Sequence, residues 1–395
     1  MAATSMRVII AGGGIGGLAT ALALARHGIP SQVYERHPRF PEEGAGIQIG
    51  PNGTRILMAL GAGELLRKQA ATPTALSVRD AATARELTHL PLGAWIRERH
   101  GFPYWTAHRK DLHAALRQRA AAEPLVTLTP GVEITSYEDD GNAIHARSAN
   151  GEILNGSVLI AADGLWSMLR RQIAGNGVPR PVGKVAYRTV VASEHLPTGL
   201  VPNAVHIWLA PGAHIVHYPV NAGHDIALVV IVDDPLCLSE WDVPAPDDAV
   251  RDKILHIAEP LQSLVGAARN WRHWSLQAMT PLARWATGRA ALLGDAAHPM
   301  LPFLAQGAVM ALEDATVLAA RLAKSNGNVA ASLQAYQDDR RPRALRVAEA
   351  SRRNGRIYHL AGAAALARNG VMKVLPSTLV MAGFDWLYGW KGLEI

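Results

Sequence analysis

Short apolar runs rich in β-branched residues alternate with longer Ala- and Leu-rich stretches near the start of the chain. Residues 7–11 read RVIIA, and after a glycine-rich turn residues 18–28 read LATALALARHG. The first composition is typical of a buried strand, and the second of a helix that stops at Gly28. A second strand, SQVYE, ends at Glu35. The pattern predicts a strand, a turn, a helix and a second strand at the start of an α/β fold.

Similar strand ends recur far along the chain. The apolar run at 158–162 leads into Asp163-Gly164, and the run at 290–293 leads into Gly294-Asp295. A turn at Gln306-Gly307 then opens a stretch of Ala, Met, Leu and Glu that favours helix. Three strand ends that carry polar residues predict one composite site at the edge of a parallel sheet.

The middle of the chain has a different pattern. Residues 185–191, 205–210, 214–220 and 225–232 are apolar runs separated by Pro, Gly and Asn. Such spacing predicts a meandering sheet. Beyond Glu313 the pattern predicts a helix, then a second, charged helix, and then an apolar segment broken by Gly and Pro.

The glycines of the first turn form a motif that is typical of nucleotide binding. Gly12, Gly14 and Gly17 fit G-x-G-x-x-G, the pattern of a turn in which a pyrophosphate approaches the backbone at a helix N-terminus. Glu35 follows 18 positions after Gly17 and would accept hydrogen bonds from a ribose without a 2′-phosphate. This fingerprint predicts a dinucleotide but does not distinguish NAD from FAD. Asp295 would accept from a ribityl hydroxyl, and N–H groups near Gly307 would stabilise charge on a reduced flavin.

Composition narrows the classes of protein. The chain has 395 residues, 49% hydrophobic and 18% charged, as expected of a globular protein with two joined domains. The net charge of +6 is scattered, so we expect no nucleic-acid partner, but a field that attracts anionic ligands. The single cysteine, Cys237, excludes an intrachain disulfide. Without a visible signal peptide or membrane span, a cytoplasmic location is expected.

The motifs together resemble a known family. They are GGGIGG with Glu35-Arg36, GAGIQIGPN at 44–52, HRKDL at 108–112, AADG at 161–164 and GDAAHPMLPFLAQGA at 294–308. Their order and extent, from about residue 6 to 320, resemble the single-component group A flavoprotein hydroxylases, and within them the salicylate hydroxylase and 6-hydroxynicotinate 3-monooxygenase group.

This resemblance implies a fold and its boundaries. A Rossmann-type, glutathione reductase-like FAD-binding domain would comprise 1–75, 105–180 and 276–320. It would be interleaved with a β-sheet substrate domain at 76–104 and 181–275, and a helical segment would follow at 321–395. The last segment would cover the FAD domain or join a dimer interface, so the chain is expected to be a monomer or a homodimer.

The resemblance also implies cofactor contacts. Glu35-Arg36 would hold the adenosine ribose, and Arg109 the FAD phosphate or ribityl chain. Asp163 lies in the motif associated with both FAD and NAD(P)H. Asp295 would bind the ribityl chain or pyrophosphate, and Gln306-Gly307 would lie against the isoalloxazine.

The activity implied is hydroxylation of a small phenolic or hydroxylated heteroaromatic acid through a flavin C4a-hydroperoxide, with NADH or NADPH and O2 as co-substrates. One alternative is an FAD monooxygenase acting on a non-aromatic or larger substrate, of the epoxidase or drug-modifying type. Another is a non-catalytic flavin- or NAD-binding regulatory protein.

Strand periodicity selects candidates for the substrate. His214 and Tyr218 share one face of their strand, and His217 points to the other. We hypothesise that neutral His214 accepts the proton of a substrate hydroxyl, with His217 as the competing candidate if a bulge shifts the register. The diverging histidines exclude a metal site at this strand.

Four further residues complete the expected substrate site. Gln48 occupies the place where 6-hydroxynicotinate 3-monooxygenases have a histidine, which favours a benzoate-type phenol over a pyridine. In the family, Pro302 would lie beside the flavin and shape the oxygen pocket. Arg188 is a candidate partner for a carboxylate, and Trp208 a candidate aromatic wall.

Overall fold

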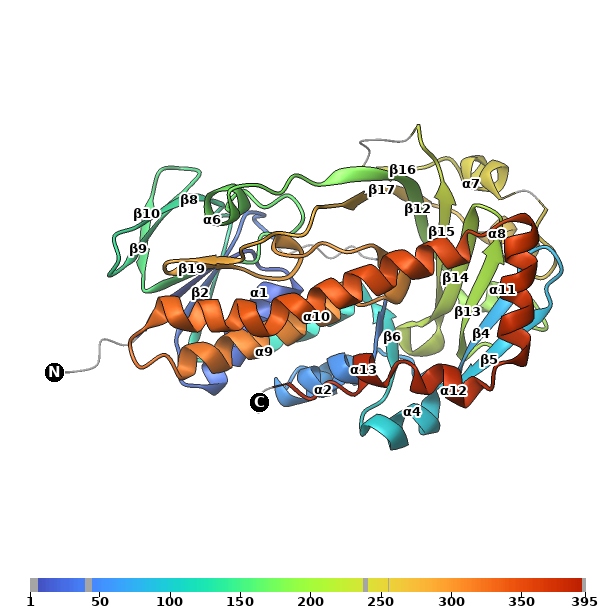
Figure 1. Cartoon of the computed structure of the whole chain (residues 1–395), viewed down its shortest axis with the longest axis horizontal. Helices are drawn as coiled ribbons and strands as arrows, with labels where there is room; N and C mark the ends of the chain where they lie inside the picture. Colours follow the sequence, from blue (N-terminus) through green and yellow to red (C-terminus); the bar gives the residue numbers. More distant parts are fainter. Residues whose placement is uncertain (1–5, 40–44, 237–240, 255, 393–395) are drawn as a thin grey trace.

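The computed structural model describes residues 6–39, 45–236, 241–254 and 256–392 (Figure 1). Two large sheets lie toward opposite ends of the molecule, and long helices run between them. Gly44, at the start of the GAGIQIGPN stretch, and Cys237 lie outside the described residues.

A six-stranded sheet forms the first layer, in the order β18-β19-β11-β1-β2-β7. Neighbouring strands from β19 to β7 are parallel, and β18 is antiparallel to β19. The buried runs of β1 and β11 are apolar at every position because both faces of this sheet are covered. The strands are β1 Val8–Ala11, β2 Ser31–Glu35, β7 Val126–Pro130, β11 Val158–Ala161, β18 Ala286–Thr287 and β19 Ala290–Leu292.

Helices and a small meander cover this sheet. Helix α1, Ile15–Arg26, lies between α5, Arg109–Ala121, and α9, Gly307–Ala323. The three-stranded sheet of β8 Ile134–Asp139, β9 Ile144–Ser148 and β10 Ile153–Gly156 packs against β1 and β11 (Figure 1). The predicted strand, turn, helix and strand unit is therefore confirmed.

The second layer is an eight-stranded sheet in the order β16-β17-β12-β15-β14-β13-β4-β5. Its central strands are the predicted meander, and β4 and β5 join it from an earlier part of the chain. The strands are β4 Ala75–Asp80, β5 Glu86–Pro91, β12 Arg180–Ala192, β13 Ala204–Ala210, β14 Ala213–Val220, β15 Asp225–Asp233, β16 Trp241–Pro244 and β17 Arg272–Ala278.

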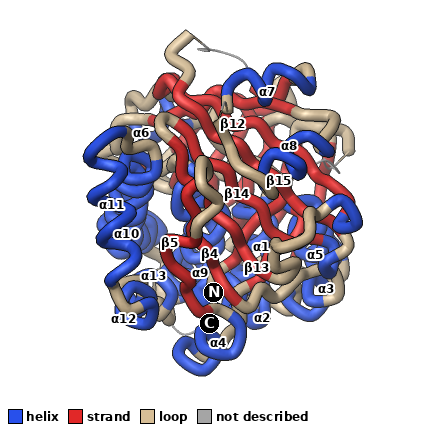
Figure 2. The backbone as a smooth tube through the Cα atoms, turned by 90° about the vertical axis from the view of Figure 1, so that its right-hand side faces the viewer, coloured by secondary structure: helices blue, strands red, loops and turns tan. Residues whose placement is uncertain are grey.

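The two faces of the eight-stranded sheet have different neighbours. On the outer face, α7, Asp247–Lys253, and α8, Leu261–Ala267, pack over a separate apolar core (Figure 2). The inner face contacts the loop before α9 through Ile231 and Phe303. Because the inner face meets the segment that follows β19, the two sheets enclose the region where the predicted motifs converge.

Shorter elements connect the two layers. Strands β3, Gly46–Ile49, and β6, Trp105–His108, form a two-stranded sheet, and β6 contacts β14. Helix α10, Val329–Tyr358, packs along α9 and ends beside the eight-stranded sheet (Figure 1). The other helices are α2 Pro51–Ala59, α3 Gly63–Arg67, α4 Gly93–His100, α6 Arg170–Ala174, α11 Gly362–Val374, α12 Ser377–Ala382 and α13 Asp385–Tyr388. The predicted mixed α/β fold with C-terminal helices is confirmed.

No helix among the described residues is both long enough and apolar enough to cross a membrane.

Candidate active site

The glycine turn after β1 combines two tight contacts with one open position. A Cβ atom on Gly12 would lie 2.4 Å from the oxygen of Ala162, and one on Gly17 would lie 1.9 Å from the oxygen of Gly12. Gly12 also has a φ of +109°, which disfavours any side chain. By contrast, a Cβ on Gly14 would meet nothing within 4 Å. The open space at Gly14 is where the backbone can approach a pyrophosphate.

Glu35 lies at the end of β2, next to this turn. Its two carboxylate oxygens accept hydrogen bonds from Gly13 N at 2.9 Å and His37 N at 3.0 Å. These bonds fix the carboxylate of Glu35, which is one of the residues that line a cavity of about 240 Å³. The predicted cofactor residues that line the cavity are Gly12, Gly14, Glu35, Arg36, Arg109 and Asp163.

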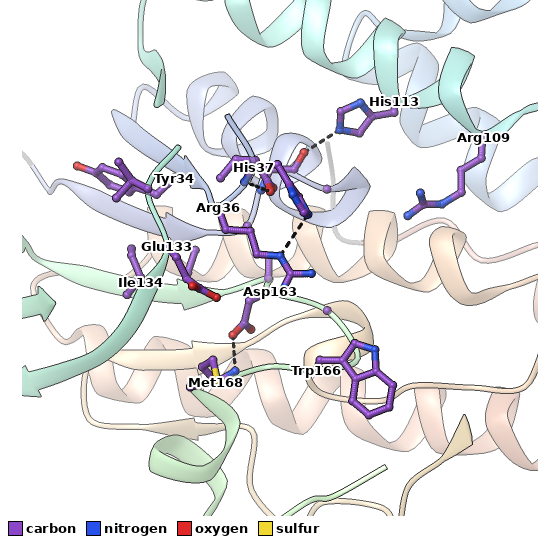
Figure 3. Close-up of a pocket in the computed structure, with 18 of the residues that line it drawn as sticks. Tyr34, Arg36, His37, Arg109, His113, Glu133, Ile134, Asp163, Trp166 and Met168 are labelled. Carbon is purple, nitrogen blue, oxygen red and sulfur yellow. Dashed lines mark hydrogen bonds between the residues drawn. The ribbon is translucent and has the colours of Figure 1, made fainter. Parts of the chain in front are cut away.

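Helix α5 supplies the facing wall of the cavity. Arg109 begins the helix and extends toward the cavity (Figure 3). One turn later, His113 Nε2 is 2.8 Å from the oxygen of Gly13. Burial lowers the pKa of His113, so its neutral ring holds the glycine turn against α5. No local motif marks His113, because its partner Gly13 lies 100 residues away along the chain.

Arg170 joins the two distant strand ends. Its buried guanidinium donates to the oxygens of Gly164 and Leu165 on one side and of Asp295 and Ala296 on the other, at 2.7–3.1 Å. The loops after β11 and β19 are therefore held together by one side chain. No motif in the sequence marks Arg170, because two of its partners lie more than 120 residues away along the chain.

Asp163 points into the same cavity from the loop after β11. Its Oδ2 accepts from Met168 N at 2.9 Å, while Oδ1 is buried and has no partner among the described residues. Burial raises the pKa of this carboxyl group. An unpartnered buried acceptor in a cavity fits a ligand that brings hydroxyl or N–H donors.

Asp295, Gln306 and Gly307 form a second group beyond Arg109. Asp295 is exposed, but the protein around its carboxyl group removes part of its hydration and so raises its pKa. The positive charges of His298 and Arg109 oppose that shift. A Cβ on Gly307 would lie 4.0 Å from Asp295 Oδ1, so the carboxylate stands beside the first turn of α9. The Gln306 side chain points into the protein and accepts from Asn52 at 3.1 Å. Any contact of Gln306 with a cofactor would therefore come from its backbone.

A buried ionic network fixes the start of α9. Arg340 of α10 is 2.8 Å from both Glu313 and Asp314, and Arg343 is 2.6 Å from Glu313. His298 Nε2 lies 2.5 Å from Asp314. Burial opposes ionisation of Asp314, but His298 and Arg340 hold its pKa at about 2. This network joins the consecutive helices α9 and α10, and no motif in the sequence marks it.

The strand β14 separates the two candidate histidines as its periodicity predicts. His217 stacks on His206 at 4.5 Å, within the core under the outer helices. His214 lies on the inner face, with its ring 5.4 Å from Phe303 and 5.2 Å from Tyr358. Burial, then His359 and Lys184, lower the pKa of His214 well below its ordinary value. The register contains no bulge that would bring His217 to the inner face.

Tyr218 follows His214 on the inner face and meets β3. Its hydroxyl would lie 2.8 Å from a Cβ on Gly46, and it interacts with Gln48. The Gln48 oxygen also accepts from the hydroxyl of Tyr104 at 2.7 Å. Burial raises the pKa of Tyr218, so its phenol stays protonated. The structure thus brings Gln48 and Tyr218 together as expected, and it adds Tyr104.

Arg188 lies on the inner face, whereas Trp208 does not. The Arg188 guanidinium is 4.8 Å from the ring of Trp274, and its charge acts on Tyr218. Trp208 is buried in the outer core and stacks on His217. The expectation that Trp208 forms an aromatic wall is wrong, because alternate residues of β13 face opposite sides. Trp274 of β17 has the position that Trp208 was expected to have.

Pro302 begins a single helical turn at 302–304 between α9 and the inner face. Phe303 of this turn packs against Ile231 and His214, while Pro302 and Leu301 are half-buried. The segment from β19 to α9 therefore connects the Asp295 group to the histidine.

These features fit FAD. The cavity at Gly14 and Glu35 matches an adenosine and a pyrophosphate, and Asp295 with the start of α9 lies farther along, toward the inner sheet face. Donors, an unpartnered acceptor and open backbone occur where a flavin dinucleotide requires them.

Comparisons with known proteins agree with this geometry. A family described as "FAD binding domain" matches residues 5–351. The chain is 39% identical to 3-hydroxybenzoate 6-hydroxylase 1 of Aquipseudomonas alcaligenes, over 98% of each chain. It is 34% identical to 6-hydroxynicotinate 3-monooxygenase of Bordetella bronchiseptica, over 88% of this chain and 91% of the relative.

The fold is also that of a solved relative. A salicylate hydroxylase substrate complex superposes with a TM-score of 0.84 at 26% identity, covering 98% of this chain and 97% of the other. The resemblance inferred from the motifs is confirmed, and so is FAD as the expected cofactor. The chain belongs to the family of FAD-dependent aromatic hydroxylases.

Proposed function

We propose that this protein hydroxylates a hydroxybenzoate, using NADH or NADPH and O2. The observation that carries the proposal is the arrangement of the inner sheet face. A neutral imidazole at His214 and the phenol of Tyr218 lie at the two ends of the inner face of β14, and Arg188 of β12, whose charge acts on Tyr218, lies on the same face of the sheet. A hydroxybenzoate has matching groups, with a phenol at one end of the ring and a carboxylate at the other.

The spacing supports a single-ring substrate. Tyr218 is four positions after His214, which is about 13 Å along a strand. Val216 lies between them on the same face and is only half-buried. We assign the phenol to His214 and the carboxylate to Arg188, with Tyr218 and Gln48 as further hydrogen-bonding groups.

The chemistry expected of these residues is activation of the ring. His214 accepts the phenolic proton, which raises the electron density of the ring carbon that receives oxygen. Pro302 lines the approach to that carbon. Bound FAD, reduced by NADH or NADPH, supplies the oxygen atom from O2.

The cofactor assignments follow the two groups described above. Glu35 and Arg36 bind the adenosine ribose, and the backbone at Gly14 binds the pyrophosphate. Arg109 and Asp295 hold the phosphate and ribityl portion between them. Asp163 accepts from the cofactor through its unpartnered Oδ1.

Relatives at similar identity act on different rings, one named for 3-hydroxybenzoate and one for 6-hydroxynicotinate. Gln48, bound to Tyr104, supports the benzoate. The test is aerobic oxidation of NADH and NADPH by the FAD-loaded protein with 3-hydroxybenzoate, 4-hydroxybenzoate, salicylate and 6-hydroxynicotinate. Product is quantified by mass spectrometry, since oxidation without product is uncoupled turnover. Hydroxylation of 6-hydroxynicotinate alone would overturn the proposal.

A further inference from the structure

A hydrogen-bonded row leads from His214 to the surface of the protein. His214 Nδ1 is 2.9 Å from His359 Nε2, and His359 Nδ1 is 2.7 Å from Asp233 Oδ1. His214 is 2% exposed, whereas the Asp233 side chain is 48% exposed. The row therefore connects the inner sheet face to solvent in two hydrogen bonds.

Three structural elements hold the row in place. His359 follows the last residue of α10, and its backbone oxygen accepts from Gly212 N at 3.2 Å. Asp233 ends β15, where it pairs in register with Lys184 of β12. Lys184 donates to the Asp233 carboxylate, so the end of the row is ionic. The end of α10 is thus tied to the eight-stranded sheet at His359.

The ends of the row determine where its hydrogens lie. Asp233, as a carboxylate, can only accept, so His359 Nδ1 carries a hydrogen and His359 Nε2 is an acceptor. Lys184 Nζ is 3.1 Å from His359 Nδ1, a longer contact than the 2.7 Å bond to the carboxylate, which favours this assignment. His214 Nδ1 must then donate, and its Nε2 has a lone pair and no hydrogen-bond partner among the described residues.

We propose that His359 and Asp233 form a proton relay that holds His214 in its Nδ1–H tautomer and carries the phenolic proton of the substrate to solvent. This inference rests on the proposed function, because it requires a phenol at His214. His359 acts through His214 and is a positioning residue.

Each step of the relay breaks one bond to hydrogen and forms another. The substrate O–H gives its proton to His214 Nε2, the Nδ1 proton of His214 passes to His359 Nε2, and the Nδ1 proton of His359 passes to Asp233 and on to water. One proton enters and one leaves, so both rings end neutral. The reverse movement protonates the product oxygen and restores the starting tautomers.

The surroundings of the row favour neutral rings. Burial lowers the pKa of both histidines, Lys184 lowers them further, and Asp233 opposes this at His359. The other titratable group against His214 is Tyr358, whose pKa burial raises to about 12. Neither ring is therefore trapped as an imidazolium, which would stop transfer through it.

The relay can be tested by proton release. The FAD-loaded enzyme, without NAD(P)H, is mixed with 3-hydroxybenzoate in weak buffer containing a pH indicator, and release is followed by stopped flow. We expect His359→Phe to slow both release and hydroxylation about 10²-fold. His359→Ala should be slowed similarly, and added imidazole, which fits the space left by the side chain, should restore part of each rate in that variant. Asp233→Asn, at an exposed position, should slow release in the same direction. His217→Phe, on the other face of the strand, is the matched control and should behave as the parent.

The outcomes separate the relay from the proposed function. If the parent hydroxylates the substrate and His214→Phe does not, but His359→Phe and Asp233→Asn release protons at the parent rate, the relay is wrong and the proposed function stands. If the parent oxidises no NAD(P)H with any hydroxybenzoate, the proposed function fails first. Loss of rate in His359→Ala without recovery in imidazole would also overturn the relay, because a purely structural defect gives that result.

Discussion

Gly14 shows how a single position can separate cofactor binding from folding. Because a Cβ there meets nothing within 4 Å and its φ is −74°, a larger residue is compatible with the folded chain. We expect Gly14→Val to fold and to lose FAD, since the side chain would fill the space of the pyrophosphate. FAD content is measured from the visible absorbance of the purified protein.

The control for this variant is Gly370→Val, at an exposed position in α11 that is equally open. It should retain FAD. A fully flavinylated Gly14→Val protein would mean that the pyrophosphate lies elsewhere.

The role of a single residue can be predicted from the sequence where that role depends on the backbone conformation of a short segment. The roles of Gly12 and Gly14 could be inferred because the tight turn and the open position are properties of a short motif. His113, Arg170 and His359 could not, because each acts through a partner 100 or more residues away along the chain. No local signal marks such a partner.

At the scale of elements, β14 allows the two faces of one strand to be compared. His214→Phe should abolish most hydroxylation while FAD remains bound, because the acceptor on the inner face is lost. His217→Phe should leave hydroxylation close to that of the parent, because His217 stacks in the outer core. The comparison is made by substrate-dependent NAD(P)H oxidation with product analysis. Equal loss in both variants would show that strand packing, and not the imidazole of His214, limits the rate.

The α9–α10 pair gives a second comparison, between a buried and an exposed ion pair. Arg340 and Asp314 are 1% and 0% exposed, whereas Arg321 and Asp339 are 34% and 35% exposed. We expect Arg340→Met to lower the free energy of unfolding by about 3–5 kcal/mol, because it leaves buried carboxylates without their partner. Arg321→Met should cost no more than about 1 kcal/mol. Urea denaturation measures both, and similar losses would contradict the buried network.

Strands could be predicted where the alternation of side chains between two faces continued over several residues. The alternation along 214–220 gave the face of each histidine correctly, and the four strands of the meander were found where the runs lie. Periodicity within β13 alone does not show that Trp208 falls on the outer face, because that follows only from its pairing with Ile215 of β14.

At the scale of the whole molecule, the proposed FAD site draws on parts of the chain that belong to different layers of the fold. Glu35 ends a strand of the six-stranded sheet, and Gly14 lies in the turn between β1 and α1. Arg109 begins α5, and Asp295 belongs to the segment that leads to the inner sheet face. The family resemblance, which rests on the order of the motifs, predicted that these parts would converge. The contacts between the layers were not predicted, because they depend on side chains such as Phe303 to which the motifs assign no role.

Because the cofactor would contact all of these parts, its removal should lower the free energy of unfolding of the whole protein. A ligand that binds only the native state at 100 times its Kd adds about 2.7 kcal/mol to the free energy of unfolding. We therefore expect FAD-depleted protein to unfold at a lower temperature than protein in excess FAD, and the difference to grow with FAD concentration. Gly14→Val should lack this dependence while unfolding near the temperature of the depleted parent. Thermal denaturation followed by circular dichroism checks both, and a parent that does not respond to FAD would contradict a cofactor site shared between the layers.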